Sequence, residues 1–181
     1  YTLLATGLLD YHFSETLALE LGGSFGFSFD KEDKRILKDE FDIETQILRT
    51  QYIATGGLLW TPVYGKTQLP DGQLVYFDTF LTGGVGMTGI NYTYEQCRTG
   101  ETEEARANAP DKPSPTTKGY MTFLLGIGQK FFLTKDFGVR WDLRDHFFNY
   151  NTADGSCFPD LEGSTKLHQN VTLQMGASTF F

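Results

Sequence analysis

The stretch LALELGGSFGFSF, residues 17–29, alternates between bulky apolar side chains and small or polar ones. Every bulky residue lies at an odd-numbered position, and the even-numbered positions hold Ala, Glu, Gly or Ser. Because successive side chains of a strand point to opposite sides, the stretch predicts a strand with one broad apolar face and one narrow polar face. A half-buried strand of a soluble protein also alternates. The contrast in bulk favours a closed barrel with lipid outside and a polar lumen inside.

The composition is compatible with one β-rich domain spanning residues 1–181. The chain contains 16 Phe, 9 Tyr and 20 Gly, which suits strands with interfacial aromatics and a tightly packed interior. No segment approaches the roughly 18 consecutive apolar residues of a membrane helix. The net charge of −8 argues against nucleic acid as a partner. The chain starts without a signal peptide, so we expect a mature or trimmed form.

Seven extended segments are predicted, and the connections between them alternate in length. The segments are residues 2–13, 17–29, about 43–60, 73 to about 94, 119–133, 137–150 and 166–181. Outer-membrane barrels join their strands by brief periplasmic turns and longer extracellular loops. We therefore expect an antiparallel up-and-down transmembrane β-barrel, all-β and of about eight strands, with loops 30–42, 95–118 and 151–165 outside the cell.

An odd number of segments conflicts with the even strand count of bacterial single-chain barrels. The simplest explanation is a first strand upstream of Tyr1, and a further strand within residues 95–118 is the alternative. The abundance of Lys, Glu and Leu in residues 32–48 also allows a competing helix there, which fits the barrel only as a short helix in loop 30–42.

Extending the alternation through every segment assigns eight charged side chains to the interior. They are Asp10, Glu20, Arg49, Asp78, Lys130, Arg140, Asp142 and Arg144, with His12 and His146 among them. The interior of an eight-stranded barrel is just wide enough for side chains to fill it. An unpaired buried ion costs several kcal/mol, so the balance of four acids and four bases predicts a salt-bridged, closed lumen.

A catalytic or proton-handling cluster of Asp10, His12 and His146 is the functional alternative, because ionisable groups inside a membrane are candidates for function. The sequence has no nucleophile elbow and no His-x-x-x-His zinc pair. We therefore assign no catalytic, cofactor-binding or metal-binding residue, and His168 stands alone near a loop.

The outward-facing set predicts a lipid-facing surface with an aromatic belt at each margin. The belts comprise Tyr11, Phe13, Trp60, Phe137 and Phe181 near the short turns, and Phe29, Tyr92, Phe147 and Tyr150 near the long loops. Small residues on such a surface permit close approach between subunits. We therefore expect a homo-oligomer contact at Thr50, Ala54, Gly56 and Gly83.

The two cysteines, Cys97 and Cys157, both fall in predicted loops. An even number of exposed cysteines in an exported protein allows one disulfide, and two free thiols are the alternative.

The final stretch, LHQNVTLQMGASTFF at residues 167–181, resembles the C-terminal strand signal of Gram-negative outer-membrane barrels. Gln174, Gly176 and Phe181 match that signal, whereas Thr179 departs from its penultimate aromatic position. The resemblance implies export to the periplasm and insertion by the barrel-assembly machinery.

Three internal stretches extend this resemblance over nearly the whole chain outside the loops. They are YHF at 11–13 leading to Leu19–Glu20, PVYGK at 62–66, and GQKFF at 128–132 leading to RWDLRD at 140–145. Together they resemble the outer-membrane β-barrel domain family of myxobacteria and Bdellovibrio-like bacteria. That family is OmpA-like in fold and is not an established enzyme group, which implies a small barrel in the outer membrane of a Gram-negative bacterium.

The sequence therefore predicts a structural or interaction protein of the cell envelope, with outer-membrane lipid around it and no cofactor. A small-barrel lipid-modifying enzyme would have only His146 and Ser24 or Ser28 as raw material. A narrow porin is a further alternative. A soluble lipocalin-like binder would need an apolar pocket, whereas the charges here fall on the inner face.

Overall fold

The structure is a computed structural model, and it describes residues 2–28, 48–68, 70, 72, 74–92, 116–151 and 164–179. The described chain is all-β. Its strands are β1 (Thr2–His12), β2 (Leu17–Ser28), β3 (Leu48–Gln68), β4 (Leu74–Tyr92), β5 (Thr116–Phe132), β6 (Phe137–Asn151) and β7 (Thr165–Thr179). Within these ranges no helix is long and apolar enough to cross a membrane.

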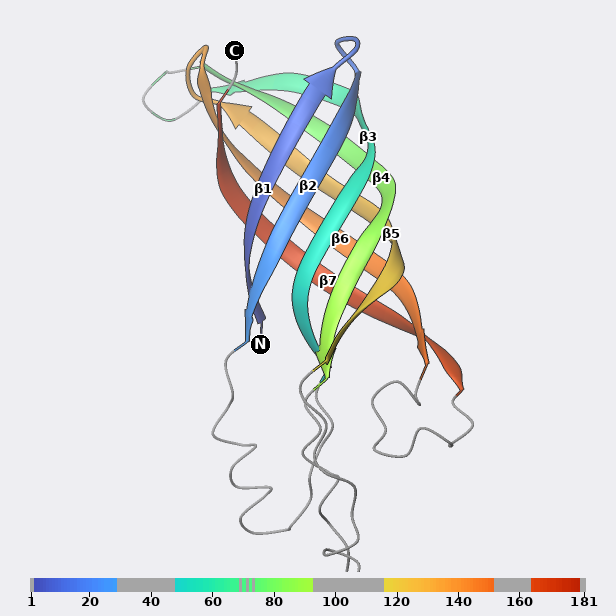
Figure 1. The fold of residues 1–181 in the computed structure, drawn as a ribbon. Helices are drawn as coiled ribbons and strands as arrows, with labels where there is room; N and C mark the ends of the chain where they lie inside the picture. The colour runs from blue at the N-terminus through green and yellow to red at the C-terminus, as the bar shows by residue number, and fades with distance from the viewer. Residues whose placement is uncertain are drawn as a thin grey trace, which may run out of the picture.

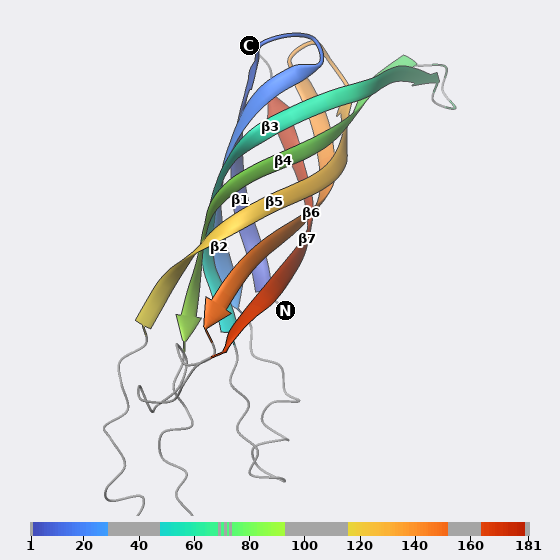
Figure 2. The same cartoon turned by 90° about the vertical axis from the view of Figure 1, so that its right-hand side faces the viewer.

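The seven strands form one open sheet in chain order, and each strand pairs antiparallel with the next. This confirms the predicted up-and-down order and the number of segments. The sheet is strongly curled (Figures 1 and 2), so that side chains of β1 and β2 reach those of β5 and β6 across its concave face. The two edge strands are β1 and β7.

The connection between the third and fourth segments differs from the prediction. Residues 61–68 and 74–78 continue β3 and β4 as a paired arm, closed by a turn in which Gly72 has a φ of 88°. The β2 pairing ends at Trp60, and the register of β3 shifts between Trp60 and Val63. Pro62 lies at that shift, where its missing N–H donor is tolerated. Figure 2 shows the arm projecting from the end of the sheet that carries the short turns.

The two faces of the curled sheet have opposite polarity. Along β6 the even-numbered side chains from 138 to 148 are buried on the concave face, and the odd-numbered ones lie on the convex face. Large apolar side chains remain exposed on the convex face, among them Phe25 at 67%, Leu173 at 68% and Met175 at 82%. Among the described residues, the largest of the fully buried side chains is Arg144. The apolar residues are thus outside and the charges inside.

Glycines on the concave face let neighbouring strands approach closely. A Cβ on Gly57 would lie 2.5 Å from the Gly83 carbonyl oxygen, and one on Gly84 would lie 2.5 Å from the Gly56 carbonyl oxygen. At Gly128 a Cβ would lie 2.5 Å from both the Asp142 Cβ and the Phe80 ring. These positions leave room for the bulky charged groups opposite them.

The competing helix at 32–48 and the alternative strand within 95–118 lie almost wholly outside the described residues. Within those ranges, Leu48 belongs to β3, and β5 begins at Thr116, three residues before the predicted start.

Candidate functional site

Two short hairpins place like charges opposite one another. In the β1–β2 turn, the Phe13 N–H donates to the Leu17 carbonyl at 3.0 Å and sets the register that pairs Asp10 with Glu20. In the β5–β6 turn, the Leu133 N–H donates to the Phe137 carbonyl at 3.1 Å, and the register pairs Lys130 with Arg140. Like charges directly opposite each other destabilise a hairpin. The repulsion within each hairpin is therefore offset by the opposite charges of the other hairpin. The curl of the sheet brings the acidic pair to the basic pair.

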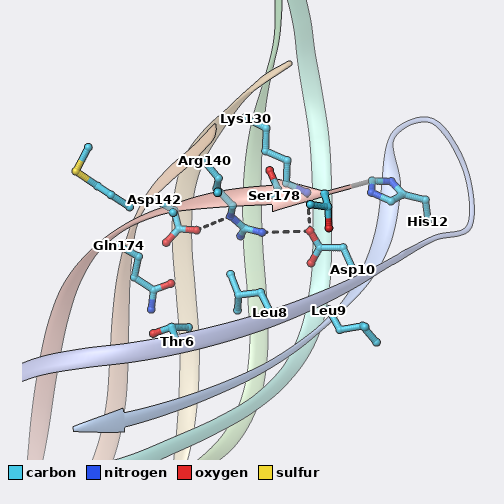
Figure 3. Close-up of a pocket in the computed structure, with 14 residues that line it drawn as sticks. Thr6, Leu8, Leu9, Asp10, His12, Lys130, Arg140, Asp142, Gln174 and Ser178 are labelled. Carbon is cyan, nitrogen blue, oxygen red and sulfur yellow. Dashed lines mark hydrogen bonds and ion pairs between the residues drawn. The ribbon is translucent and has the colours of Figure 1, made fainter. Parts of the chain in front are cut away.

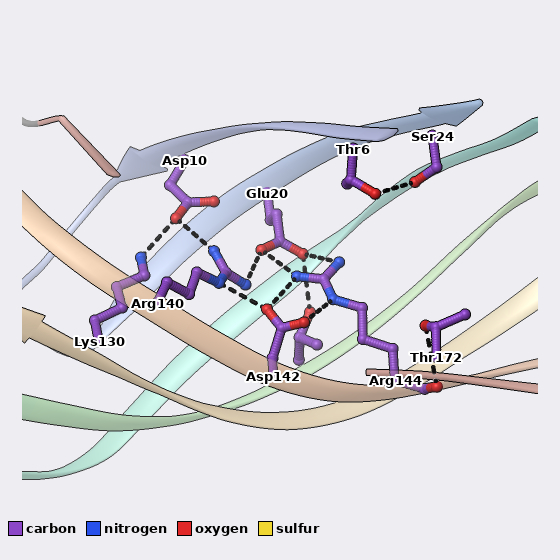
Figure 4. Close-up of polar contacts among 10 residues, drawn as sticks. Thr6, Asp10, Glu20, Ser24, Lys130, Arg140, Asp142, Arg144 and Thr172 are labelled. Atoms are coloured by element: carbon purple, nitrogen blue, oxygen red, sulfur yellow. Dashed lines mark hydrogen bonds and ion pairs between the residues drawn. The ribbon is translucent and has the colours of Figure 1, made fainter. Parts of the chain in front are cut away.

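Lys130 and Arg140 reach the acidic pair through three contacts (Figure 4). Lys130 Nζ donates to Asp10 Oδ2 at 2.6 Å, and Arg140 Nη1 donates to the same oxygen at 3.2 Å. Arg140 Nη2 donates to Glu20 Oε2 at 2.6 Å. These bonds join β1 and β2 to β5 and β6 across the concave face.

Asp142 and Arg144 extend the contacts further along β6. Arg144 binds Glu20 in bidentate fashion, with Nη1–Oε1 at 2.8 Å and Nη2–Oε2 at 2.9 Å. Asp142 accepts from Arg140 Nε at 2.7 Å and from Arg144 Nε at 3.1 Å. Bidentate charge-assisted bonds are short and geometrically specific. We call the set of Asp10, Glu20, Lys130, Arg140, Asp142 and Arg144 the charged cluster; it contains three acids and three bases.

An apolar floor supports the charged cluster. The Phe80 ring is fully buried with Ala18 and Leu59. The Arg140 guanidinium carbon lies 4.4 Å from the centroid of that ring, and Lys130 Nζ lies 5.5 Å from it. Cations over an aromatic face are stabilised, and more so when water is excluded.

Two residues expected in the interior network lie outside the charged cluster. Asp78 is on the concave face opposite Lys130 in the β4–β5 register, but Lys130 directs its ammonium to Asp10. Arg49 pairs with Asn91, and the alternation of β4 places Asn91 on the convex face. The prediction that Arg49 faces inward is therefore wrong. The reason is an irregularity between Thr50 and Tyr52 that shifts the alternation of β3 by one residue.

Because of the same irregularity, the predicted outward position of Thr50 in the protomer contact is also wrong. Thr50 Oγ1 accepts a hydrogen bond from Asn170 Nδ2 at 3.2 Å across the concave face, so this side chain faces inward. Ala54, Gly56 and Gly83 lie on the convex face, where they pair with the exposed Met87, Val85 and Leu58.

His12 lines the same cavity as Asp10 (Figure 3), but in the described part of the chain the hydrogen bonds of Asp10 go to Lys130 and Arg140 and not to a histidine. His146 is buried, and its Nδ1 lies 3.3 Å from the Asn170 carbonyl oxygen. His12 is exposed at the end of β1. His168 packs against the rings of Phe148 and Tyr150, with centroids 5.0 Å and 5.9 Å away. In the described ranges, no group of three or more His, Cys, Asp or Glu side chains is placed to hold a metal ion.

Nearer the long loops than Arg144, the buried side chains of the described residues include His146 but no Asp, Glu, Lys or Arg. Thr122 Oγ1 donates to Thr88 Oγ1 at 2.7 Å, and Ile90 packs on Phe148 with Tyr120 and Tyr150 beside them. We call Thr88, Ile90, Thr122, Leu124 and Phe148, all buried, the neutral layer.

Two features escaped sequence reasoning. Asp145 falls on the convex face, in register with Leu125 and Val171, and its Oδ1 atom is buried without a hydrogen-bond partner. The alternation that assigns Val139, Trp141 and Leu143 outward also assigns Asp145 outward, so the signal was present. The second feature is a cavity of about 350 Å³ between β1 and β7, which no sequence pattern marks.

Several predicted residues lie outside the described ranges or next to their ends. Cys97 and Cys157, the expected disulfide, are outside them, and so is Phe181 of the C-terminal strand signal. The other two residues of that signal, Gln174 and Gly176, belong to β7.

Comparisons of the chain with family models, curated proteins and solved structures gave no match.

Proposed function

We propose that this protein is an integral outer-membrane β-barrel of a Gram-negative bacterium, with a lumen closed by ion pairs, and that it acts as a structural or interaction protein of the cell envelope. The observation that supports this most directly is the inverted polarity of the sheet. Every strand presents apolar side chains to the outside, while the charged cluster fills the inside. Such a surface suits hydrocarbon, and monomeric soluble proteins rarely expose apolar patches of this extent.

The interior supports a closed barrel over a narrow porin or a lipocalin-like binder. Arg144 and Asp142 are each only 1% exposed, so the charged cluster leaves little room for water around them. A binder of apolar ligands would need an apolar pocket, and the middle of this interior is occupied by guanidinium and carboxylate groups.

The lipid-modifying enzyme lacks a geometric basis in the described residues. A nucleophile must lie within hydrogen-bond reach of its base. Ser24 Oγ instead bonds Thr6 Oγ1 at 2.9 Å, while His146 contacts the Asn170 carbonyl. The proposal therefore assigns no catalytic residue.

In this proposal the long connections face the outside of the cell and the short turns face the periplasm. Insertion would require the barrel-assembly machinery, as the resemblance of the C-terminal strand implies. Ala54, Gly56 and Gly83 form a small-residue surface on β3 and β4, where a second protomer can approach closely.

The test uses the two tryptophans, both on the convex side. Trp60 is 50% exposed, and Trp141 lies at an outward position of β6. The variants Trp60→Phe and Trp141→Phe each leave one tryptophan, whose fluorescence is compared in vesicles of brominated and unbrominated lipid. We expect bromine to quench both. Equal emission in the two lipids would contradict a membrane barrel.

Two further measurements test the lumen and the oligomer. A steady single-channel conductance would contradict a closed lumen. Crosslinking of the single variant Ala54→Cys in membranes that yields only monomer would contradict the oligomer.

A further inference from the structure

The arm of residues 61–68 and 74–78 extends beyond both of the strands that flank β3 and β4. The pairing of β3 with β2 ends at Trp60, and the pairing of β4 with β5 starts at Tyr76. In the described part of the chain, residues 66–68 and 74–75 therefore form a ribbon of only two strands. Such a ribbon is at best marginally stable in water by itself, so the packing of its faces decides whether it forms.

One face of the arm is covered within the molecule. It continues the convex face and carries Gly65 opposite Phe77 and Thr67 opposite Val75. The Phe77 ring lies over Gly65, where a Cβ would be 2.8 Å from it, and its centroid is 6.1 Å from that of the Phe131 ring. Val75 is only 4% exposed. This face is therefore already packed.

The opposite face of the arm is uncovered. Lys66 lies opposite Tyr76, with Tyr64 and Leu74 on the same side of the ribbon. Tyr64 is 70% exposed, Tyr76 57% and Leu74 50%, and Lys66 is exposed as well. We call these four residues the arm face. Asp78 shares their side of the ribbon at its base, half-buried and opposite Tyr64. A partner of the arm would therefore pack on the arm face.

The residue types of the arm face suit a membrane–water interface better than a protein partner. A tyrosine ring is apolar with a hydroxyl at its tip, and such rings collect at the level of the lipid headgroups. A lysine lays its aliphatic stem along apolar groups and extends its ammonium to anionic lipids. Lys66 lies in the middle of the arm face, whereas lysine is depleted from the core of protein–protein interfaces.

The direction of the arm also favours lipid as its partner. In Figure 2 the arm extends sideways beyond the wall of the curled sheet, at the level of the short turns. Trp60, at the base of the arm, is 50% exposed on the convex face. In the membrane barrel proposed above, hydrocarbon surrounds the wall and the short turns lie at the periplasmic surface. An arm that leaves sideways at this level runs along that surface of the bilayer.

We propose that the arm is a membrane anchor, and that the arm face binds the phospholipid headgroups of the periplasmic leaflet. The proposal rests on the membrane environment proposed above and adds a second kind of lipid contact to it. The convex face meets hydrocarbon, whereas the arm face meets the phosphate-bearing headgroups through two phenols and one ammonium. The anchor holds the short-turn end of the barrel at a fixed depth, on the side where β3 and β4 lie.

The experiment measures the depth of single tryptophans in vesicles of phosphatidylethanolamine and phosphatidylglycerol. Trp60→Phe/Trp141→Phe removes both native tryptophans, and Tyr64→Trp or Lys135→Trp then adds one reporter. Lys135 is exposed in the β5–β6 turn at the same end of the sheet, so it is the matched control. Bromine is attached to the acyl chains either close to the headgroup (shallow) or close to the terminal methyl (deep).

We expect shallow bromine to quench the Tyr64→Trp reporter about twofold more strongly than deep bromine, because amphipathic rings settle at the headgroup level. The Lys135→Trp reporter should keep nearly all of its emission in either lipid, because its turn extends into water. Trp141, which is retained in the single variant Trp60→Phe, should be quenched in the same vesicles because it lies on the wall.

A charge reversal tests whether the arm face binds the phosphate group. Lys66→Glu places a carboxylate against the lipid phosphates, so quenching of the Tyr64→Trp reporter by shallow bromine should fall by about half. Lys66→Arg keeps the cation and should keep the quenching. Lys135→Glu makes the same change of charge at the turn and should leave the reporter unchanged. The residues that line the cavity between β1 and β7 lie outside the arm, and so does the charged cluster, so these variants leave the interior intact.

Each other outcome overturns the proposal. Stronger quenching of the Tyr64→Trp reporter by deep bromine means that the arm lies in hydrocarbon. Quenching by neither bromine, with Trp141 quenched, means that the arm face meets water or a protein. Equal quenching after Lys66→Glu and after Lys135→Glu means that the arm face does not bind phosphate. If Trp141 itself is not quenched, the membrane barrel is contradicted, and the anchor is contradicted with it.

Discussion

The charged cluster and the neutral layer fill two halves of one interior by opposite means. Near the short turns, six charged side chains form ion pairs with one another, and Arg140 alone contacts three carboxylates. Near the long loops, the Thr88–Thr122 hydrogen bond and the Ile90–Phe148 contact fill the neutral layer, which contains no ion pair. The two halves share strands β5 and β6; the charged cluster adds acids from β1 and β2, and the neutral layer adds Thr88 and Ile90 from β4.

The two halves differ in how far apart in the sheet the strands they connect lie. The neutral layer is built from neighbouring strands, since Thr88 and Thr122 lie on the paired β4 and β5. The charged cluster joins strands far apart in the sheet, because Asp10 and Glu20 reach β5 and β6. We infer that the charged cluster determines closure of the curl, whereas the neutral layer adds local packing.

The largest expected effect is that of replacing Arg144, because it disrupts the charged cluster. Arg144→Met removes one of the two arginines that Glu20 and Asp142 share, and removing one member of a buried ion pair costs about 3–5 kcal/mol. We expect that loss in the free energy of unfolding, measured by urea titration in lipid vesicles.

The matched control is the double variant Glu20→Gln/Arg144→Met, which keeps two acids and two bases. It should recover more than half of the loss, because a balanced network with isosteric neutral groups has no unpaired charge. If the double variant loses as much unfolding free energy as the two single variants together, the two side chains are uncoupled. That result would contradict the inference that the charged cluster closes the curl.

A second prediction concerns Gly84, one of the concave-face glycines at which β3 and β4 approach closely. Gly84→Ala places a Cβ 2.5 Å from the Gly56 carbonyl oxygen, and backbone must move to accept it. We expect a loss of about 1–3 kcal/mol in unfolding free energy, as for other overpacked interiors. Gly23→Ala is the control, since its Cβ meets nothing within 4 Å. Equal losses of unfolding free energy in the two variants would show that the close approach of β3 and β4 does not restrict the side chain at position 84.

A smaller effect is expected in the neutral layer. Thr122→Val removes the hydroxyl that donates to Thr88 at 2.7 Å, which should lower the unfolding free energy by about 1 kcal/mol. Adding Thr88→Val should cost little more, because the pair is then replaced by two apolar groups. A Thr122→Val loss as large as that of Arg144→Met would contradict the distinction between the two halves.

The alternation of residues 17–29 was sufficient to predict the strands and much of the charged cluster, because a period of two assigns both faces once the register is known. Six of the eight expected charges come together in the structure. The assignment failed at Arg49 and Thr50, since an irregularity in β3 shifts the period and no residue type there marks it. Pro62 and the Pro70–Asp71–Gly72 sequence indicated turns, so the paired arm was missed. Which acid meets which base depends on the curl, a property of the whole sheet.

The smallest effect is expected on the outer surface, where Asp145 is the exception to an apolar face. Its register partners Leu125 and Val171 are each 61% exposed, and its Oδ1 atom has no hydrogen-bond partner. In the proposed membrane barrel this face meets lipid, where a carboxylate opposes folding by less than the roughly 2–4 kcal/mol of Arg or Lys at the midplane. We therefore expect Asp145→Asn to raise the unfolding free energy in vesicles by about 0.5–1 kcal/mol, while Asp142→Asn, on the concave face and bonded to two arginines, lowers it. One substitution thus gives opposite signs three residues apart on one strand. A destabilising Asp145→Asn would mean that this carboxylate meets a donor in the membrane, such as a second protomer.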